Sequence, residues 1–100
     1  MPTAMPLFAV TCTRGPAYRH GTPMEEQDDW RPHADFMNAL VDDGFVVLGG
    51  PLDEPDVLLI IRAASADAIR ARLAPDPWHQ MGLLTIKSIS PWTLRLGTLP

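Results

Sequence analysis

A histidine at position 33 offers the clearest acid/base chemistry in this sequence. An imidazole gains and loses a proton near neutral pH, which suits it to general acid/base catalysis. Apolar residues follow it at spacings of three and four: Phe36, Met37 and Leu40. Those spacings place His33 on the apolar stripe of a helix, so we expect its ring to face the protein interior. The ordinary alternative is a half-buried structural histidine with one hydrogen-bond partner, and position alone favours that alternative.

Asp76 is the carboxylate that could complete such a site. A carboxylate that accepts a hydrogen bond from one ring nitrogen of His33 would fix the tautomer of the imidazole and stabilise the imidazolium when it forms. Asp76 also precedes Pro77, and an Asp-Pro pair is ordinarily a turn or the start of a helix. The sequence leaves both roles open.

Three further positions could bind a substrate. Arg31 lies two residues before His33 and could hold a carboxylate by a two-pronged contact near a pocket, although on the surface it would have no such role. Gly50 and Pro51 lie where a strand is expected to end, so the backbone there could approach a ligand closely or simply turn. The Gly-rich spacing and the lysine of a phosphate-binding loop are absent.

Trp78, which follows Asp76-Pro77, is another candidate substrate-binding residue. Together with Trp30 and Trp92 it could line an aromatic pocket. Tryptophans are at least as often anchors of a core or of a dimer interface, so that alternative stays open.

Metal and thiol chemistry are not indicated. His20 and His79 form no close-spaced ligand pair with His33, so we expect no metal site. Cys12 has no basic neighbour in sequence, and a cysteine in a strand usually packs as a small hydrophobic residue. The acid/base chemistry expected of His33 and Asp76 needs no cofactor.

The elements that would position these residues alternate along the chain. Strands are predicted over 7–13, 45–48, 57–61 and 82–90, the last ended by Pro91. One helix is predicted from Trp30 to a stop at Gly44, and another from an N-cap at Ser65 to Pro75, followed by an irregular or short helical link from Asp76. Residues 14–29 form a long polar loop, which is typical of a lid or a mobile excursion. The order β-α-β-β-α-β predicts an α+β, ferredoxin-like fold with an antiparallel sheet.

A homodimer is expected from the same pattern. Right-handed crossovers place both helices on one face of the sheet, which leaves the other face bare. The strand over 57–61 is apolar on both faces, and so is much of the strand over 7–13. A bare apolar sheet face must be covered, and a second copy packed sheet against sheet is the simplest cover.

Composition narrows the classes of function. The 100 residues, 46% of them hydrophobic, suit one domain over 1–100 with a real core. A formal net charge of −4 argues against binding to nucleic acid. No apolar run is long enough to cross a bilayer, and Met1–Pro6 lacks the features of a secretion leader. The single cysteine excludes an internal disulfide, which suits a reducing cytoplasm.

Several short motifs occur in a fixed order over nearly the whole chain, from the first strand to Trp92. They are Arg31-Pro32-His33 with Phe36 and Leu40, Gly44, Gly49-Gly50-Pro51-Leu52, Asp76-Pro77-Trp78 with Gly82, and Pro91-Trp92. No single motif is specific, but the ordered set resembles the YCII-related (YciI-like) family. The resemblance implies a ferredoxin-like fold assembled as a dimeric α+β barrel. It also implies an active-site cleft built around a histidine and an aspartate, which correspond to His33 and Asp76.

The resemblance also bears on activity. At least one group of similar proteins eliminates chloride from a chlorinated hydroxyquinone, and the wider barrel superfamily includes muconolactone isomerases and cofactor-free oxygenases. The loop over 14–29 is more acidic and proline-rich than the family pattern, and the extension over 93–100 lies outside the motifs. No substrate is therefore transferred from the family to this chain.

We expect a lyase or isomerase acting on a small molecule, anionic or aromatic, in which His33 moves a proton at a carbon next to a carbonyl or phenol. Asp76 would orient the imidazole, and Arg31 would hold an anionic group. Two alternatives stay open, because a fold does not determine a function. One is a binding protein whose cleft holds a metabolite without chemistry, and the other is an accessory protein whose dimer surface is its function.

Overall fold

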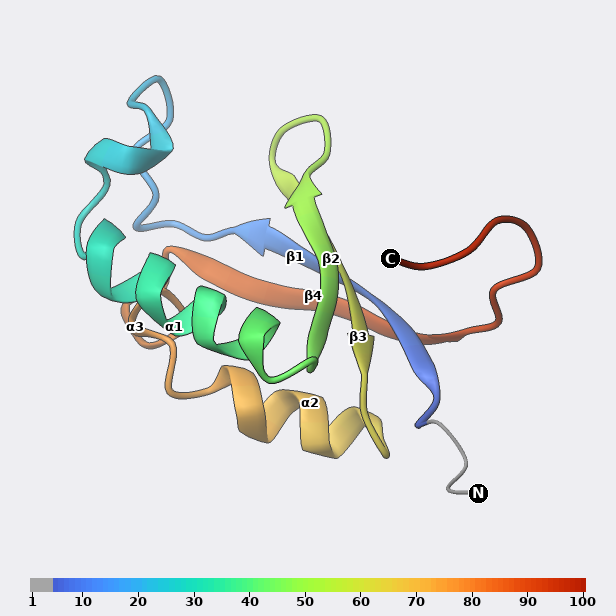
Figure 1. The fold of residues 1–100 in the computed structure, drawn as a ribbon. Coiled ribbons are helices and arrows are strands. Elements are labelled where there is room, and N and C mark those ends of the chain that lie inside the picture. The colour runs from blue at the N-terminus through green and yellow to red at the C-terminus, as the bar shows by residue number, and fades with distance from the viewer. Residues whose placement is uncertain (1–4) are drawn as a thin grey trace.

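In the computed structural model, which describes residues 5–100, four strands form one antiparallel sheet whose helices all lie on one side (Figure 1). The strands are β1 (Leu7–Arg14), β2 (Val46–Pro51), β3 (Asp56–Arg62) and β4 (Leu84–Trp92). The helices are η1 (Met24–Glu26), α1 (Trp30–Asp42), α2 (Ala66–Leu73) and α3 (Pro77–Met81). The sheet order β2-β3-β1-β4 confirms the ferredoxin-like α+β fold. Most of Met1–Pro6, where we expected no secretion leader, lies outside the described residues.

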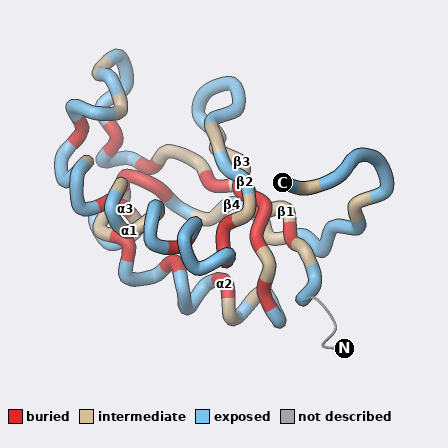
Figure 2. Tube along the Cα trace, viewed as in Figure 1, coloured by how far each residue is buried: buried red, intermediate tan, exposed pale blue. Residues whose placement is uncertain are grey.

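The core lies between the sheet and the helices (Figure 2). In β1 the residues Phe8, Val10 and Cys12 are buried, while the residues between them are only partly so. This alternation follows from the two-residue period of a strand, which sends successive side chains to opposite faces. Val10 pairs with Leu59 of β3 on one side and Ile89 of β4 on the other, so the central strand contributes the middle of the core.

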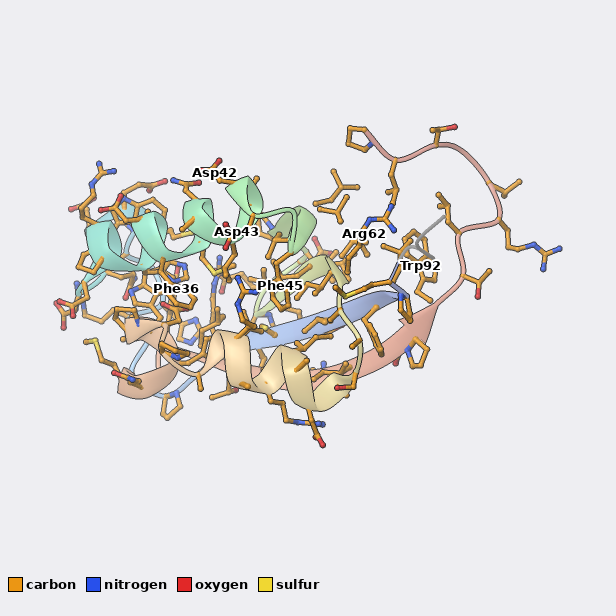
Figure 3. All side chains as sticks on the ribbon, turned by 60° about the horizontal axis from the view of Figure 1, so that its bottom comes forward. Phe36, Asp42, Asp43, Phe45, Arg62 and Trp92 are labelled. Atoms are coloured by element: carbon orange, nitrogen blue, oxygen red, sulfur yellow. The ribbon has the colours of Figure 1, made fainter. Side chains whose placement is uncertain are left out.

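Helix α1 begins and ends where local signals predict. Asp29 precedes it in a left-handed conformation with φ 56°, which a short polar side chain tolerates better than most. Gly44, with φ 80°, follows the helix and lets the chain turn toward β2. Figure 3 shows Phe36 of α1 and Phe45, the residue before β2, on the helix side of the sheet, whereas Trp92 lies at the C-terminal end of β4.

Two strands, β2 and β4, differ from the prediction by more than one residue at an end. Gly50 and Pro51 lie inside β2, where Gly50 pairs with Leu58 of β3. Strand β4 starts at Leu84, not at Gly82, and it continues through Pro91, which pairs with Phe8. Because β2 and β4 are the two edge strands, a proline there does not have to donate to a neighbour.

The sheet face opposite the helices carries several apolar residues, as the sequence predicts. Ile60 of β3 pairs with Leu48 of β2 and with Ala9 of β1, so these side chains share that face. Leu48 is 44% exposed and Trp92 is 38% exposed. The homodimer inferred from this face stays a prediction. None of the helices within residues 5–100 is long and apolar enough to cross a membrane.

Candidate active site

The short helix α3 carries the carboxylate of the site. Asp76 is the N-cap of this helix, and its side chain accepts a hydrogen bond from the backbone N–H of Trp78 at 3.2 Å. Pro77 fits the first helical turn, where its missing N–H costs nothing. Gly82, in a left-handed conformation with φ 78°, ends the helix. The Asp-Pro pair is therefore the start of a helix, and the aspartate that caps it is fully buried.

Helix α1 brings His33 to this carboxylate. The Nδ1 atom of His33 lies 2.9 Å from each of the two carboxylate oxygens of Asp76. The His33 side chain is 10% exposed and that of Asp76 is 0% exposed. A carboxylate only accepts, so Nδ1 carries the proton and donates it, which leaves Nε2 as the nitrogen available to a substrate. This pair spans 43 residues of sequence and can form only in the folded chain.

Trp78 fixes the plane of the His33 ring. The two rings are stacked, with centroids 3.9 Å apart and planes 3° from parallel. The indole N–H of Trp78 donates to the backbone carbonyl of Asp28 at 2.8 Å, which holds the tryptophan in place. Trp30 adds a third ring, 5.8 Å from Trp78 and 6.0 Å from His33. The imidazole is thus constrained by a carboxylate at its edge and by indoles around it.

A second histidine lies beside the same carboxylate. The Nε2 atom of His79 is 3.8 Å from Oδ2 of Asp76, and its side chain is 11% exposed. Burial lowers the pKa of His79, the charge of Asp76 opposes that change, and His33 adds to it. We conclude that His79 is a neutral imidazole at pH 7.

Cys12 packs in the core beneath this site. Burial raises the pKa of the Cys12 thiol to about 12, and the negative charge of Asp76 acts in the same direction. The thiol therefore stays protonated, and Cys12 is a small hydrophobic residue rather than a nucleophile.

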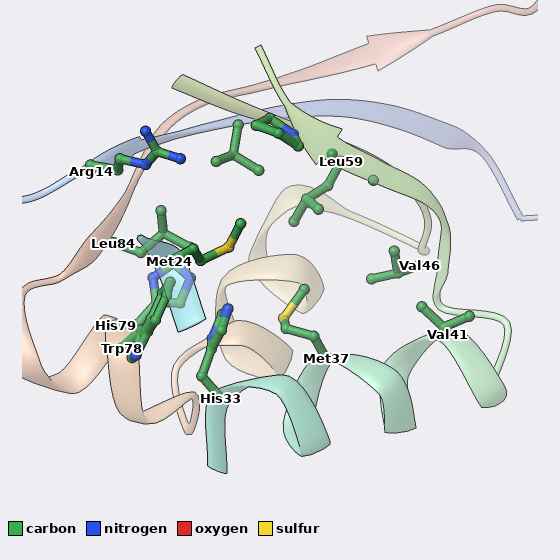
Figure 4. A pocket seen from close by; sticks show the side chains of 14 residues that line it. Arg14, Met24, His33, Met37, Val41, Val46, Leu59, Trp78, His79 and Leu84 are labelled. Carbon is green, nitrogen blue, oxygen red and sulfur yellow. The ribbon is translucent and has the colours of Figure 1, made fainter. Parts of the chain in front are cut away.

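A cavity of about 250 Å³ opens in front of His33 (Figure 4). His33, Trp78 and His79 form one wall. Most of the remaining lining is apolar and comes from α1 and the sheet: Met37, Val41, Val46, Val57, Leu59 and Leu84. Arg14, the last residue of β1, is the only arginine or lysine among the described lining residues. An apolar cavity with a few convergent polar groups is the usual form of a small-molecule site.

The structure brings most of the predicted site residues together. His33, Gly50, Pro51 and Trp78 line the cavity, and Asp76 lies behind His33 as its partner. Arg31 is the exception. Its side chain is 75% exposed, pairs with Asp35 one helical turn away at 3.9 Å, and does not line the cavity.

Sequence reasoning missed other lining residues, among them His79, Arg14 and Met24. His79 follows Asp76 by three residues, and that spacing alone would have placed both on one face of a helix. Arg14 carries no comparable local signal, because only the folded sheet brings the end of β1 to the cavity. Met24 reaches the cavity from η1, within the long loop.

The loop between β1 and α1 is held by its own contacts. The buried side-chain amide of Gln27 donates to the carbonyls of Arg19 and Thr22, at 2.9 and 3.0 Å. The same amide accepts from the backbone N–H of Arg19 at 2.9 Å. These bonds tie this part of the loop together, and Met24 is its residue that lines the cavity.

The fold and the site define a class: small ferredoxin-like α+β proteins in which a buried histidine–aspartate pair borders a cavity. The family model for the YCII-related domain matches residues 7–93, so the chain belongs to the YCII-related domain family. No curated protein sequence matches the chain.

Among solved structures, the chain is similar to 5-chloro-2-hydroxyhydroquinone dehydrochlorinase from Burkholderia phenoliruptrix, in complex with 2,5-dihydroxybenzoquinone. The TM-score is 0.58 and the sequence identity is 21%, over 91% of this chain and 95% of the other. At that identity the likeness shows a shared fold.

Proposed function

We propose that this chain is a small-molecule lyase or isomerase that uses His33 and Asp76 as an acid/base pair and needs no cofactor. One observation carries the proposal: Nδ1 of His33 lies 2.9 Å from the buried carboxylate of Asp76, on the wall of a cavity. This is the geometry in which a carboxylate orients an imidazole and stabilises its protonated form.

In the proposed reaction, Nε2 of His33 takes a proton from a carbon next to a carbonyl, or from a phenol. Asp76 stabilises the resulting imidazolium, and Trp78 keeps the ring in position. An isomerase would return the proton at another atom of the substrate. A lyase would instead lose a leaving group from the neighbouring carbon. General acid/base catalysis of this kind contributes about 10²–10⁴-fold to a rate.

The size and lining of the cavity support a small ring as the substrate. An apolar cavity of about 150 Å³ can hold benzene, and the cavity here is about 250 Å³. The structurally similar protein is a dehydrochlorinase of a chlorinated hydroxyhydroquinone and was solved with a quinone bound. A substituted hydroxyquinone or a cyclic 1,3-dicarbonyl compound therefore belongs to the substrate class to test first.

The test is proton exchange in D₂O followed by NMR, with a panel of cyclic 1,3-diones and hydroxyquinones, together with chloride release from 5-chloro-2-hydroxyhydroquinone. We expect exchange or chloride release with wild type and a loss of about 10²–10⁴-fold in His33→Gln. His20→Gln is the matched control, since His20 lies in a loop with its side chain 56% exposed. Equal rates in His33→Gln and wild type would refute the acid/base role.

The same cavity supports a second candidate, a metabolite-binding protein without chemistry. A ligand at a hundredfold excess over its dissociation constant stabilises the folded state by about 2.7 kcal/mol. A panel compound that raises the melting temperature of wild type without exchange or elimination would favour this candidate.

We also propose that the chain acts in the cytoplasm as a homodimer, packed through the apolar sheet face opposite the helices. A charge in that face should separate the subunits, so Leu48→Glu should sediment as a monomer. Leu96→Glu is the control, because Leu96 lies in the C-terminal tail and is 88% exposed. A Leu48→Glu protein that sediments like wild type would contradict this interface.

A further inference from the structure

His79 is a second imidazole on the cavity wall, and the proposed reaction gives it no role. It lies on α3, three residues after Asp76 and next to Trp78, and it lines the same cavity as His33. Figure 4 shows it among the lining side chains, with Trp78 beside it. Its side chain is only 11% exposed. Because a polar ring that is nearly buried ordinarily has hydrogen-bond partners, this position needs a reason.

The protein leaves the ring nitrogens of His79 short of partners. Nε2 lies 3.8 Å from Oδ2 of Asp76, which is too far for a hydrogen bond but close enough for electrostatic attraction. Within residues 5–100, the hydrogen bonds of the Asp76 carboxylate go to Nδ1 of His33 and to the backbone N–H of Trp78. No hydrogen bond from a described residue reaches Nδ1 of His79.

The carboxylate of Asp76 decides which nitrogen of His79 carries the proton. Burial lowers the pKa of His79, so the ring is neutral at pH 7 and has one N–H donor and one bare acceptor. The N–H is most stable when it faces the negative charge, which places it on Nε2 and leaves Nδ1 as the acceptor. His33 has the reverse arrangement, with its N–H on Nδ1 and its acceptor on Nε2. The two rings therefore turn their donors toward one carboxylate, and each has an acceptor left over.

The cavity wall offers this acceptor little from the protein itself. Apart from the two histidines, the polar side chains among the described lining residues are Arg14 and Trp78. The indole N–H of Trp78 already donates to the carbonyl of Asp28, and the guanidinium of Arg14 pairs with a glutamate in the turn after β2. A donor for Nδ1 must therefore come from a ligand or from water. The positive charge of Arg14 disfavours an ammonium ligand, so a hydroxyl is the donor that suits this cavity.

We propose that Nδ1 of His79 accepts a hydrogen bond from a hydroxyl group of the ligand, so that the cavity selects small rings with a hydroxyl donor beyond the group that meets His33. The inference rests on the proposed function, because it takes the cavity in front of His33 as the substrate site. It adds a group that recognises the substrate without taking its proton. Such a site discriminates against a ring that lacks the hydroxyl, because Nδ1 is then left unpaired beside the ligand.

The experiment compares each of the three dihydroxybenzene isomers with the fluorophenol in which fluorine replaces one hydroxyl. The two members of a pair are of nearly equal size, and the second lacks one donor. Dissociation constants are measured by NMR titration at pH 7 under nitrogen. For at least one isomer, His79→Leu should weaken the binding of the dihydroxybenzene relative to its fluorophenol by about two- to tenfold, the value of one neutral hydrogen bond.

Two variants serve as controls. His79→Asn keeps an acceptor, because its amide oxygen can take the place of Nδ1, so it should retain part of the wild-type preference. His20→Leu removes a histidine whose side chain is 56% exposed in the loop before α1, and it should leave the preference unchanged.

The ¹⁵N shifts of the His79 ring give a second readout, which a purely structural role would not move. In the free wild-type protein Nε2 should carry the proton and Nδ1 should not. The Nδ1 signal should then move more when the preferred dihydroxybenzene binds than when its fluorophenol binds.

Four results would overturn the inference: a wild type that binds none of the six compounds, a preference in His79→Leu equal to that of wild type for all three isomers, a protonated Nδ1 in the free protein, or an Nδ1 signal that no dihydroxybenzene moves. Binding of these compounds requires no turnover, whereas proton exchange depends on His33. A failure of the hydroxyl site and a failure of the acid/base role are therefore seen in different measurements.

Discussion

Asp76→Asn is the substitution that most directly probes the candidate site. The wild-type carboxylate is fully buried and accepts hydrogen bonds from Nδ1 of His33 and from the backbone N–H of Trp78. Asparagine has nearly the same shape but offers one oxygen acceptor and one NH₂ donor. If its oxygen keeps the cap of α3, its NH₂ group faces His33, and the imidazole must switch to the tautomer protonated at Nε2.

The expected loss of stability is modest. One charge-assisted hydrogen bond, of about 1.5–3 kcal/mol, is exchanged for a neutral one of about 1 kcal/mol. Removing the buried charge also removes its desolvation cost, which offsets part of this loss of stability, and the helix cap is retained. We therefore expect the free energy of unfolding to fall by about 1–2 kcal/mol. The activity should fall far more, by about 10³–10⁴-fold, because Nε2 then carries a proton instead of accepting one.

Guanidinium denaturation measures the first quantity, and the ¹⁵N shifts of the His33 ring report the tautomer. Asp67→Asn is the control for the same chemical change at the surface, because the Asp67 side chain is 97% exposed in the first turn of α2. It should leave the unfolding free energy nearly unchanged. If Asp76→Asn matched this control in stability and left the His33 tautomer as in wild type, the buried hydrogen bond would not exist in solution.

Three further predictions follow from the same geometry. Burial lowers the pKa of His79 below 6.5, so as the pH falls the unfolded chain binds a proton there before the folded chain does. The free energy of unfolding of wild type should therefore fall as the pH drops below about 6.5. In urea titrations from pH 7 to 5, the free energy of unfolding of His79→Gln should fall less than that of wild type. Cys12, with its pKa raised to about 12, should resist iodoacetamide at pH 8 until the chain is unfolded. Gly15→Ala places a Cβ against the backbone carbonyl of Gly82, so the free energy of unfolding measured by thermal melts should fall by more than about 2 kcal/mol. Gly50→Ala is the control, because a Cβ there meets nothing within 4 Å and the unfolding free energy should change little.

The sequence was sufficient for the parts of the fold that local patterns determine. The helical spacing from His33 to Leu40 predicts which face of α1 is buried, and both residues are buried. Gly44 marks the end of α1 through its backbone freedom. The boundaries of β2 and β4 were less accurate, because whether Pro51 and Pro91 end a strand depends on their places at the sheet edges. Sheet order is a property of the folded chain.

The candidate site likewise contains residues that local sequence patterns can predict and residues that only the folded sheet brings together. Arg31 was predicted to bind an anion because it is close to His33 in sequence. Residues two apart on a helix point to different sides, so an inward His33 sends Arg31 outward, to a 75% exposed position beside Asp35. Arg14, at the end of β1, is brought to the cavity by strand pairing and carries no local signal. For Arg31, nearness to His33 in sequence was therefore a poor guide to its position in the fold.

Helix α3 and its N-cap carry three groups of the candidate site, Asp76, Trp78 and His79, and this ties the site to the fold. A helix of five residues is not stable alone, so tertiary contacts must hold it. Asp76 caps it and bonds His33, and Trp78 both stacks on His33 and donates to the Asp28 carbonyl. Substitutions at Asp76 or Trp78 should therefore change structure and chemistry together. His33 makes its bond from helix α1, so His33→Gln removes the acid/base group while the cap of α3 by Asp76 is kept.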